Sequence, residues 1–518
     1  MNLINRRDFL KLFLTSFASL AITDKFLPAL EFRNFEMGDM SPNFLILVFD
    51  TLSAEHMSLY GYPRQTTPNL ERFAKQSNVY HNHYAAGNYT TPGTASLLTG
   101  VYPWSHRAFN PYGTVNSFYQ DHNVFSLTNS LKYTNAYTPN RMAQILLRQF
   151  QHHTNKLIDI NETRLTGKIY SDILFQPDFP VAILSELILR GTTHTQLVPF
   201  SGSLFLSRIE SELLRLKVSK LTKKYPQRYP NGIPHNGGGM YIEIKDSFDL
   251  LKNELKQLPS GFLSYYHFWP PHDPYTPTSD FIGRFEDGWT PVNKPEHYYS
   301  QNFDFESLNV QRRLYDEYIA NIDFEFGRLY DFMAGNDILS NTYVMITSDH
   351  GELFERGNIG HEIKLLYQGL IHIPLIISKP GQNSQEDFYQ NTSCVDLLPT
   401  ILGILNQEIP DYLEGEILPG FNDDKDVLND RSIYALESMQ NGKYESLKNY
   451  TITLLKDQYK LIQYRYEQDL LEDELYDLKN DAEELNNLIS IEKSILTALQ
   501  QEISAKLAQV NQPEYYQP

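Results

Sequence analysis

Two short apolar runs that end in acidic residues constrain the fold more than any other feature of the chain. Residues 44–49 are followed by Asp50, and residues 342–347 lead into Asp349 and His350. Runs of β-branched and aromatic residues of this length are typical of buried strands in a parallel sheet. Ligands bind beyond the carboxyl ends of such strands, so these three polar side chains are expected at one site. Two carboxylates and an imidazole are ligands suited to a divalent cation.

A loop that turns into a helix is predicted for residues 88–100. Pro92 fits the first helical turn, because its missing N–H would be unpaired there in any case. This places Thr90 or Thr91 just before the helix, where free N–H groups favour an anion. Two interpretations follow: Thr91 caps the helix, or a hydroxyl held there is a nucleophile facing a tetrahedral oxyanion.

Five motifs, taken in order, resemble the sulfatase family, which lies within the alkaline phosphatase superfamily. Residues 50–52, 60–63 and 66–70 look like the family's opening. Residues 90–103 align with its signature Cys-x-Pro-x-Arg…Leu-Leu-Thr-Gly-x-Tyr-Pro, and residues 348–352 match its second metal motif. The resemblance implies an α/β fold, an alkaline-phosphatase/sulfatase-like doubly wound sheet with a smaller α+β C-terminal subdomain. We expect a catalytic domain over 41–410, with a variable insertion at 150–258, and the C-terminal subdomain over 425–518.

Three positions depart from the family pattern. Thr90 stands where sulfatases have the Cys that is oxidised to formylglycine, Thr94 replaces the Arg of the signature, and Thr51 replaces a frequent second Asp. Threonine is not a substrate for conversion to formylglycine, so Thr90 would have to attack as a plain alkoxide. In this respect the chain resembles the phosphodiesterase, phosphonate-hydrolase and transferase branches of the superfamily.

The resemblance also implies a set of site residues. One divalent cation is expected, calcium by the family, with manganese or magnesium as alternatives. The expected metal ligands are Asp50, Thr90, Asp349 and His350. His272 and His361 are candidates to protonate the leaving group, since imidazole titrates near neutrality. His272, Lys364 and Asn140 are the expected substrate-binding residues.

These residues predict a metal-dependent hydrolase of sulfate or phosphate/phosphonate esters that forms a covalent intermediate on Thr90. The alternatives are a transferase that delivers a phosphoryl group to an alcohol, and an inactive binding protein. The expected substrate is a small-molecule ester, or one linked to a saccharide or lipid. A net charge of −19 argues against a nucleic-acid partner.

The remaining features concern the chain's ends and surface. Residues 1–30 are expected to be a twin-arginine-type signal, with Arg6 and Arg7 before an apolar stretch too short for a comfortable membrane span. This predicts an exported, periplasmic or extracytoplasmic protein that could stay anchored to the membrane. The single cysteine, Cys394, is expected to be a buried small hydrophobe. The basic run 220–224 is expected on a solvated face.

Overall fold

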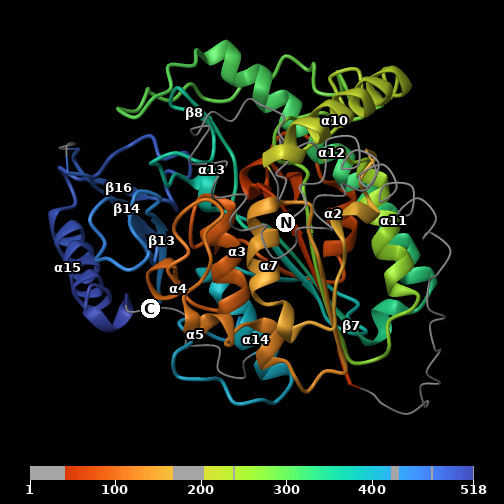
Figure 1. The fold of residues 1–518 in the computed structure, drawn as a ribbon. Coiled ribbons are helices and arrows are strands. Elements are labelled where there is room, and N and C mark those ends of the chain that lie inside the picture. The colour runs from red at the N-terminus through yellow and green to blue at the C-terminus, as the bar shows by residue number, and fades with distance from the viewer. Residues whose placement is uncertain (1–40, 167–203, 237–239, 422–430, 468–470, 517–518) are drawn as a thin grey trace, which may run out of the picture. The chain divides into compact units, whose positions relative to one another are not determined.

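The fold is known from a computed structural model that describes residues 41–166, 204–236, 240–421, 431–467 and 471–516, with the backbone alone for 204–212. An eight-stranded sheet forms its centre (Figure 1). In spatial order its strands are β11 (Glu386–Phe388), β2 (Asn78–Tyr80), β10 (Leu375–Ser378), β7 (Thr342–Thr347), β1 (Asn43–Phe49), β6 (Phe262–Phe268), β4 (Tyr133–Tyr137) and β5 (Lys156–Leu157). Strand β10 runs antiparallel to both of its neighbours, and every other adjacent pair is parallel. The predicted doubly wound sheet is confirmed, but it is mixed and not wholly parallel.

Helices cover both faces of this sheet. The α-helices of the described residues are α2 (Pro68–Ala74), α3 (Thr90–Thr99), α4 (Pro103–His106), α5 (Ser117–Gln120), α6 (Val124–Leu127), α7 (Arg141–Gln149), α10 (Leu204–Lys224), α11 (Ile244–Leu255), α12 (Phe305–Gly335), α13 (Gln368–Ile371), α14 (Leu397–Ile404) and α15 (Lys493–Val510). Alternate residues of β1 point into two different cores, because side chains in a strand alternate between faces. Phe44, Ile46 and Val48 belong to the cluster with α3, α7 and α14. The intervening residues belong to the cluster with α2, α11 and α12.

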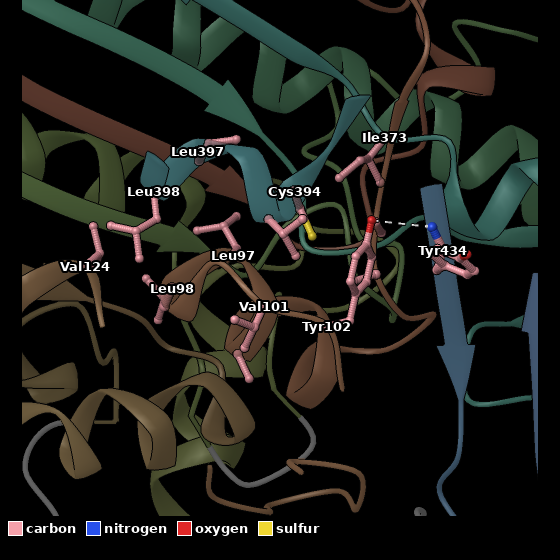
Figure 2. Packing of buried hydrophobic residues seen from close by; sticks show 14 of the residues in the cluster. Leu97, Leu98, Val101, Tyr102, Val124, Ile373, Cys394, Leu397, Leu398 and Tyr434 are labelled. Carbon is pink, nitrogen blue, oxygen red and sulfur yellow. Dashed lines mark hydrogen bonds between the residues drawn. The ribbon is translucent and has the colours of Figure 1, made fainter. Parts of the chain in front are cut away.

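The C-terminal half of α3 is packed firmly into one of these cores (Figure 2). Leu97 and Leu98 belong to the same buried cluster as Leu398 of α14 and Cys394. Burial raises the pKa of the Cys394 thiol to about 12, so this residue is the inert small hydrophobe that the sequence predicts. This packing fixes the helix whose first residue is Thr90.

A second, smaller sheet follows toward the C-terminus. Its antiparallel strands are, in order, β13 (Ser432–Glu437), β14 (Tyr450–Lys456), β15 (Tyr459–Arg465) and β16 (Glu474–Asp477). The backbone N–H of Tyr434 in β13 lies 3.5 Å from the hydroxyl of Tyr102, just beyond α3 (Figure 2). The predicted C-terminal subdomain sheet is therefore present, while its boundary near residue 425 falls outside the described residues and stays a prediction.

Two short two-stranded sheets complete the structure: β12 (Thr392–Ser393) with β3 (His83–Tyr84), and β8 (Leu353–Glu355) with β9 (Asn358–Gly360). The expected signal at 1–30 also lies outside the described residues. Within the described part of the chain, no helix has the length and apolar character needed to cross a membrane.

Candidate active site

Three neighbouring strands bring their carboxyl ends together at the candidate site. Asp50 follows β1, and Asp349 and His350 follow β7 after one intervening residue. Val48 of β1 pairs with Thr347 of β7 on one side and with His267 of β6 on the other. The parallel register therefore places His267 level with the end of β1, beside Asp50.

Asp50, His267 and Asp349 form a buried cluster in which one potential ligand atom from each lies within 4.8 Å of the others. His267 Nε2 is 3.5 Å from Asp50 Oδ2 and 3.7 Å from Asp349 Oδ2. His350 Nε2 lies 3.6 Å from an oxygen of each carboxylate. All four side chains are completely buried. The structure thus brings three of the four predicted metal ligands together and adds His267.

The chemistry of this cluster fits a divalent cation. Asp50 Oδ1 and His267 Nε2 take part in no hydrogen bond with any described residue, although buried polar atoms are normally paired. Burial and the neighbouring Asp50 carboxylate raise the pKa of Asp349. Burial alone would also raise the pKa of Asp50, but the nearby imidazoles, His272 foremost, hold it well below its usual range. Two carboxylates facing each other in this way repel, and a bound cation would relieve the repulsion.

His350 has the tautomer of a ligand. Its Nδ1 lies 2.9 Å from the carbonyl oxygen of Gly351, which can only accept a hydrogen bond. Burial and the nearby His361 lower the pKa of His350 well below its usual value, so the ring is neutral. The Nε2 lone pair then faces the two carboxylates and Thr90.

Thr90 is the first residue of α3, and its side chain points into the cluster. Its Oγ1 accepts a hydrogen bond of 3.1 Å from Asn140 Nδ2 and lies 3.4 Å from His350 Nε2. Tyr89 occupies the N-cap position without a side-chain cap, and Thr91 Oγ1 has no partner among the described residues. The interpretation that Thr91 caps the helix is therefore wrong.

Gly93 allows α3 to come this close to the end of β7. A Cβ atom built on Gly93 would lie 2.2 Å from the backbone oxygen of Asp349, a distance that real Cβ atoms essentially never show. Thr94 Oγ1, at the position of the family's Arg, lies 3.5 Å from Asp349 Oδ2. The small residues after Thr90 thus let the helix end sit directly on the carboxylate cluster.

Asn140 has two roles. Its side-chain oxygen caps α7 by accepting hydrogen bonds from the backbone N–H groups of Met142 and Ala143. Its Nδ2 donates to Asp50 Oδ2 at 2.5 Å and to Thr90 Oγ1. The structure therefore places this predicted residue in direct contact with both the expected nucleophile and a carboxylate.

Two histidine–carboxylate pairs stand beside the cluster. His361 Nδ1 is 3.0 Å from Glu352 Oε1, and His272 Nδ1 is 2.8 Å from Asp273 Oδ1. The ring centroids of His361 and His272 are 4.8 Å apart, and those of His361 and His350 are 4.5 Å apart. Burial alone would lower the pKa values of His361 and His272, but their carboxylate partners outweigh it and raise both. Both predicted proton donors therefore lie at the site in a form able to carry a proton.

Lys364 lies beside two aromatic rings. Its ammonium group sits over the rings of Tyr299 and Tyr466, at 4.7 and 4.0 Å from their centroids. A substrate-binding role for Lys364 stays a prediction.

Sequence reasoning missed His267, Glu352 and Asp273. His267 carries the same signal as Asp50 and Asp349, a polar residue near the carboxyl end of an apolar run, and the rule on strand ends could have found it. The two carboxylates adjoin recognised motifs, but only the folded chain shows which histidine each one contacts.

Comparison with known proteins agrees with this arrangement. The profile of the Sulfatase family matches residues 42–407, more than half of the chain. The chain belongs to the sulfatase family. A second profile, described as N-sulphoglucosamine sulphohydrolase, C-terminal, matches residues 359–513. An uncharacterized sulfatase of Escherichia coli is 23% identical over 474 residues, which cover 86% of this chain and 83% of the relative.

Solved structures share the fold at low identity. The phosphonate monoester hydrolase of Agrobacterium radiobacter superposes with a TM-score of 0.64 at 17% identity, covering 90% of this chain and 95% of that one. A protein solved in complex with its substrate D-glucosamine-2-N,6-O-disulfate gives a TM-score of 0.62 at 17% identity, covering 92% and 98%. The family membership makes this chain an ester hydrolase by distant homology.

Proposed function

We propose that the protein cleaves a sulfate, phosphate or phosphonate ester with Thr90 as the nucleophile. The observation that carries the proposal is the position of Thr90 Oγ1, at the start of α3 and in contact with Asn140 and His350. The relatives favour two substrate classes, a sulfated saccharide and a small phosphonate ester, by what their own names state. The absence of a formylglycine precursor at position 90 favours the phosphorus esters.

Asp50, His267, Asp349 and His350, with the Thr90 hydroxyl, would hold a divalent cation. When bound, the cation lowers the pKa of the hydroxyl and neutralises charge on the tetrahedral group. Two imidazoles beside two carboxylates favour manganese over calcium, since calcium prefers oxygen ligands. Metal analysis of the purified protein tests this choice.

The chain's own side chains account for the other requirements of the reaction. Asn140 donates to Thr90 Oγ1 and so fixes where its lone pairs point. Thr90 itself is only 1% exposed, which limits the access of bulk water to the ester during the first step. Thr90 loses its hydroxyl proton to solvent before the ester binds. The alkoxide then forms a bond to sulfur or phosphorus while the bond to the leaving oxygen breaks, and a proton from His361 Nε2 goes to that oxygen. Water, or an acceptor alcohol, then releases the group from Thr90.

The test is turnover of an aryl sulfate, an aryl phosphodiester and an aryl phosphonate by the cation-loaded full chain, beside a chelated sample. Thr90→Ala should abolish turnover, and Thr91→Ala is the matched control, because Thr91 Oγ1 has no partner among the described residues. Mass spectrometry of a quenched reaction should find the group on the peptide containing Thr90.

Turnover that survives Thr90→Ala would refute the nucleophile. Absence of any turnover with cation bound would favour the transferase or the binding protein. A gain of sulfatase activity by Thr90→Cys, co-expressed with the formylglycine-generating enzyme, would identify a sulfatase lacking only its aldehyde.

A further inference from the structure

The C-terminal half of α10 is strongly basic in an acidic protein. Residues 213–224 contain Arg215 and four lysines but no acidic residue, whereas the whole chain has a net charge of −19. Figure 1 shows α10 at the edge of the ribbon. The sequence predicts a solvated face for the lysines at 220–224, and the structure agrees, because Lys220, Lys223 and Lys224 are exposed.

One side of this helix attaches it to the rest of the protein. Leu214 is buried, and Val218 and Leu221 pack against a small cluster that includes Tyr229 and Tyr241. These three helix positions are four and three residues apart and share one face. The orientation of the exposed part of the helix surface is therefore fixed.

The outer face combines leucines with lysines. Leu213 and Leu216 are 51% and 53% exposed, which is unusual for leucine. Lys217, Lys220 and Lys224 are exposed and follow Leu213 at helical spacings of four, seven and eleven residues. Among the described residues, none of Lys217, Lys220 and Lys223 forms an ion pair, while Lys224 Nζ donates only to the neighbouring Tyr225 hydroxyl at 3.1 Å.

We propose that this outer face of α10 binds an anionic lipid surface. Lysines at the rim are attracted to acidic headgroups, and exposed leucines between them can enter the boundary between headgroups and acyl chains. A soluble polyanion would use the lysines and leave the leucines in water, so the pairing of the two favours lipid. The proposal does not depend on the reaction assigned to Thr90.

Co-sedimentation of the full chain with vesicles tests the proposal. Vesicles of phosphatidylcholine with phosphatidylglycerol are compared with phosphatidylcholine alone, at low and high salt. Binding should require the anionic lipid and fall with salt. Lys217→Gln, Lys220→Gln and Lys224→Gln together should weaken binding about 100-fold, and Leu213→Ser with Leu216→Ser about 10-fold.

The matched control is Ile491→Ser with Lys493→Gln, which removes an exposed isoleucine and an exposed lysine from another part of the surface. It should bind as the parent does, and the comparison cancels any contribution of residues 1–30. Unchanged binding in either α10 variant would overturn the proposal. Equal binding to neutral and anionic vesicles would also overturn it. So would binding to a soluble sulfated polysaccharide that the lysine substitutions weaken and the leucine substitutions leave unchanged.

Discussion

The two histidine–carboxylate pairs allow the proton donor to be identified by its pH dependence. Glu352 is almost fully buried and its carboxylate lies 3.0 Å from His361 Nδ1, whereas the Asp273 side chain beside His272 is 61% exposed. Solvent screens the second pair and not the first. We therefore expect Glu352→Gln to change the pH dependence of kcat/KM more than Asp273→Asn does.

The sign of the change follows from the direction of the pKa shift. Glu352 raises the pKa of His361 against the effect of burial, so its removal lowers that pKa. The donor must be protonated, so the alkaline limb of the kcat/KM profile should move to lower pH in Glu352→Gln. Well below both pKa values the parent and the variant should turn over at similar rates.

The assay is kcat/KM between mildly acidic and alkaline pH for an aryl and an alkyl ester of the same acid. The effect should be larger for the alkyl ester, because a poor leaving group depends more on protonation. The thermal midpoint of each variant checks that it is folded. An alkaline limb that stays in place in folded Glu352→Gln would refute the reasoning, and a limb that moves only in Asp273→Asn would transfer the role to His272.

Three further predictions concern two close contacts at the site and one buried ion pair. Gly93→Ala should lower the free energy of unfolding by about 1–3 kcal/mol in urea titrations, because the new Cβ meets the Asp349 backbone oxygen. Gly335→Ala is the control and should not lower it, because a Cβ there has no heavy atom within 4 Å. Equal effects of the two substitutions would contradict the close approach. Asn140→Ser should keep the cap of α7, whereas Asn140→Ala should lose about 1 kcal/mol of stability. Both variants should lower turnover about 100-fold. A serine variant as active as the parent would exclude a role of Asn140 in positioning Thr90. Lys460→Met should lower the free energy of unfolding by about 3–5 kcal/mol in the same titrations, because it leaves the buried Glu484 carboxylate without its ion-pair partner. The double substitution with Glu484→Gln should recover part of this loss.

The parts of the site that the sequence predicts are those with a local pattern. An apolar run that ends in a carboxylate marks a strand end wherever it occurs, so Asp50 and Asp349 are found without knowing their neighbours. His267 carries the same strand-end signal, but its place beside Asp50 requires the knowledge that β6 lies beside β1, and the strand order is set by packing of the whole sheet. Its place next to two apolar strands therefore emerges only in the folded chain.

Helix starts illustrate a second limit. Thr90 and Thr91 are both plausible caps by residue type, and local helix-start rules do not distinguish them from each other. In the structure the two threonines differ in their contacts: Asn140, which lies far along the chain, reaches Thr90 Oγ1 from the start of another helix. Likewise, the sequence alone does not fix the tautomer of His350. The structure does so through the Gly351 carbonyl oxygen, which lies beside His350 Nδ1.

Thr51 shows how the site can differ from its family without losing its framework. Its φ of 65° is an outlier for a β-branched residue and costs about 1–3 kcal/mol. Backbone contacts hold the turn: the Tyr315 hydroxyl of α12 donates to the Thr51 carbonyl at 2.6 Å and accepts from the Ser53 N–H at 3.0 Å. The Thr51 hydroxyl itself has no partner among the described residues. Thr51 is completely buried, and a threonine there carries one negative charge fewer than the family's frequent Asp. With a divalent cation bound, Asp50 and Asp349 already balance its charge, and a third carboxylate would repel the anionic ester.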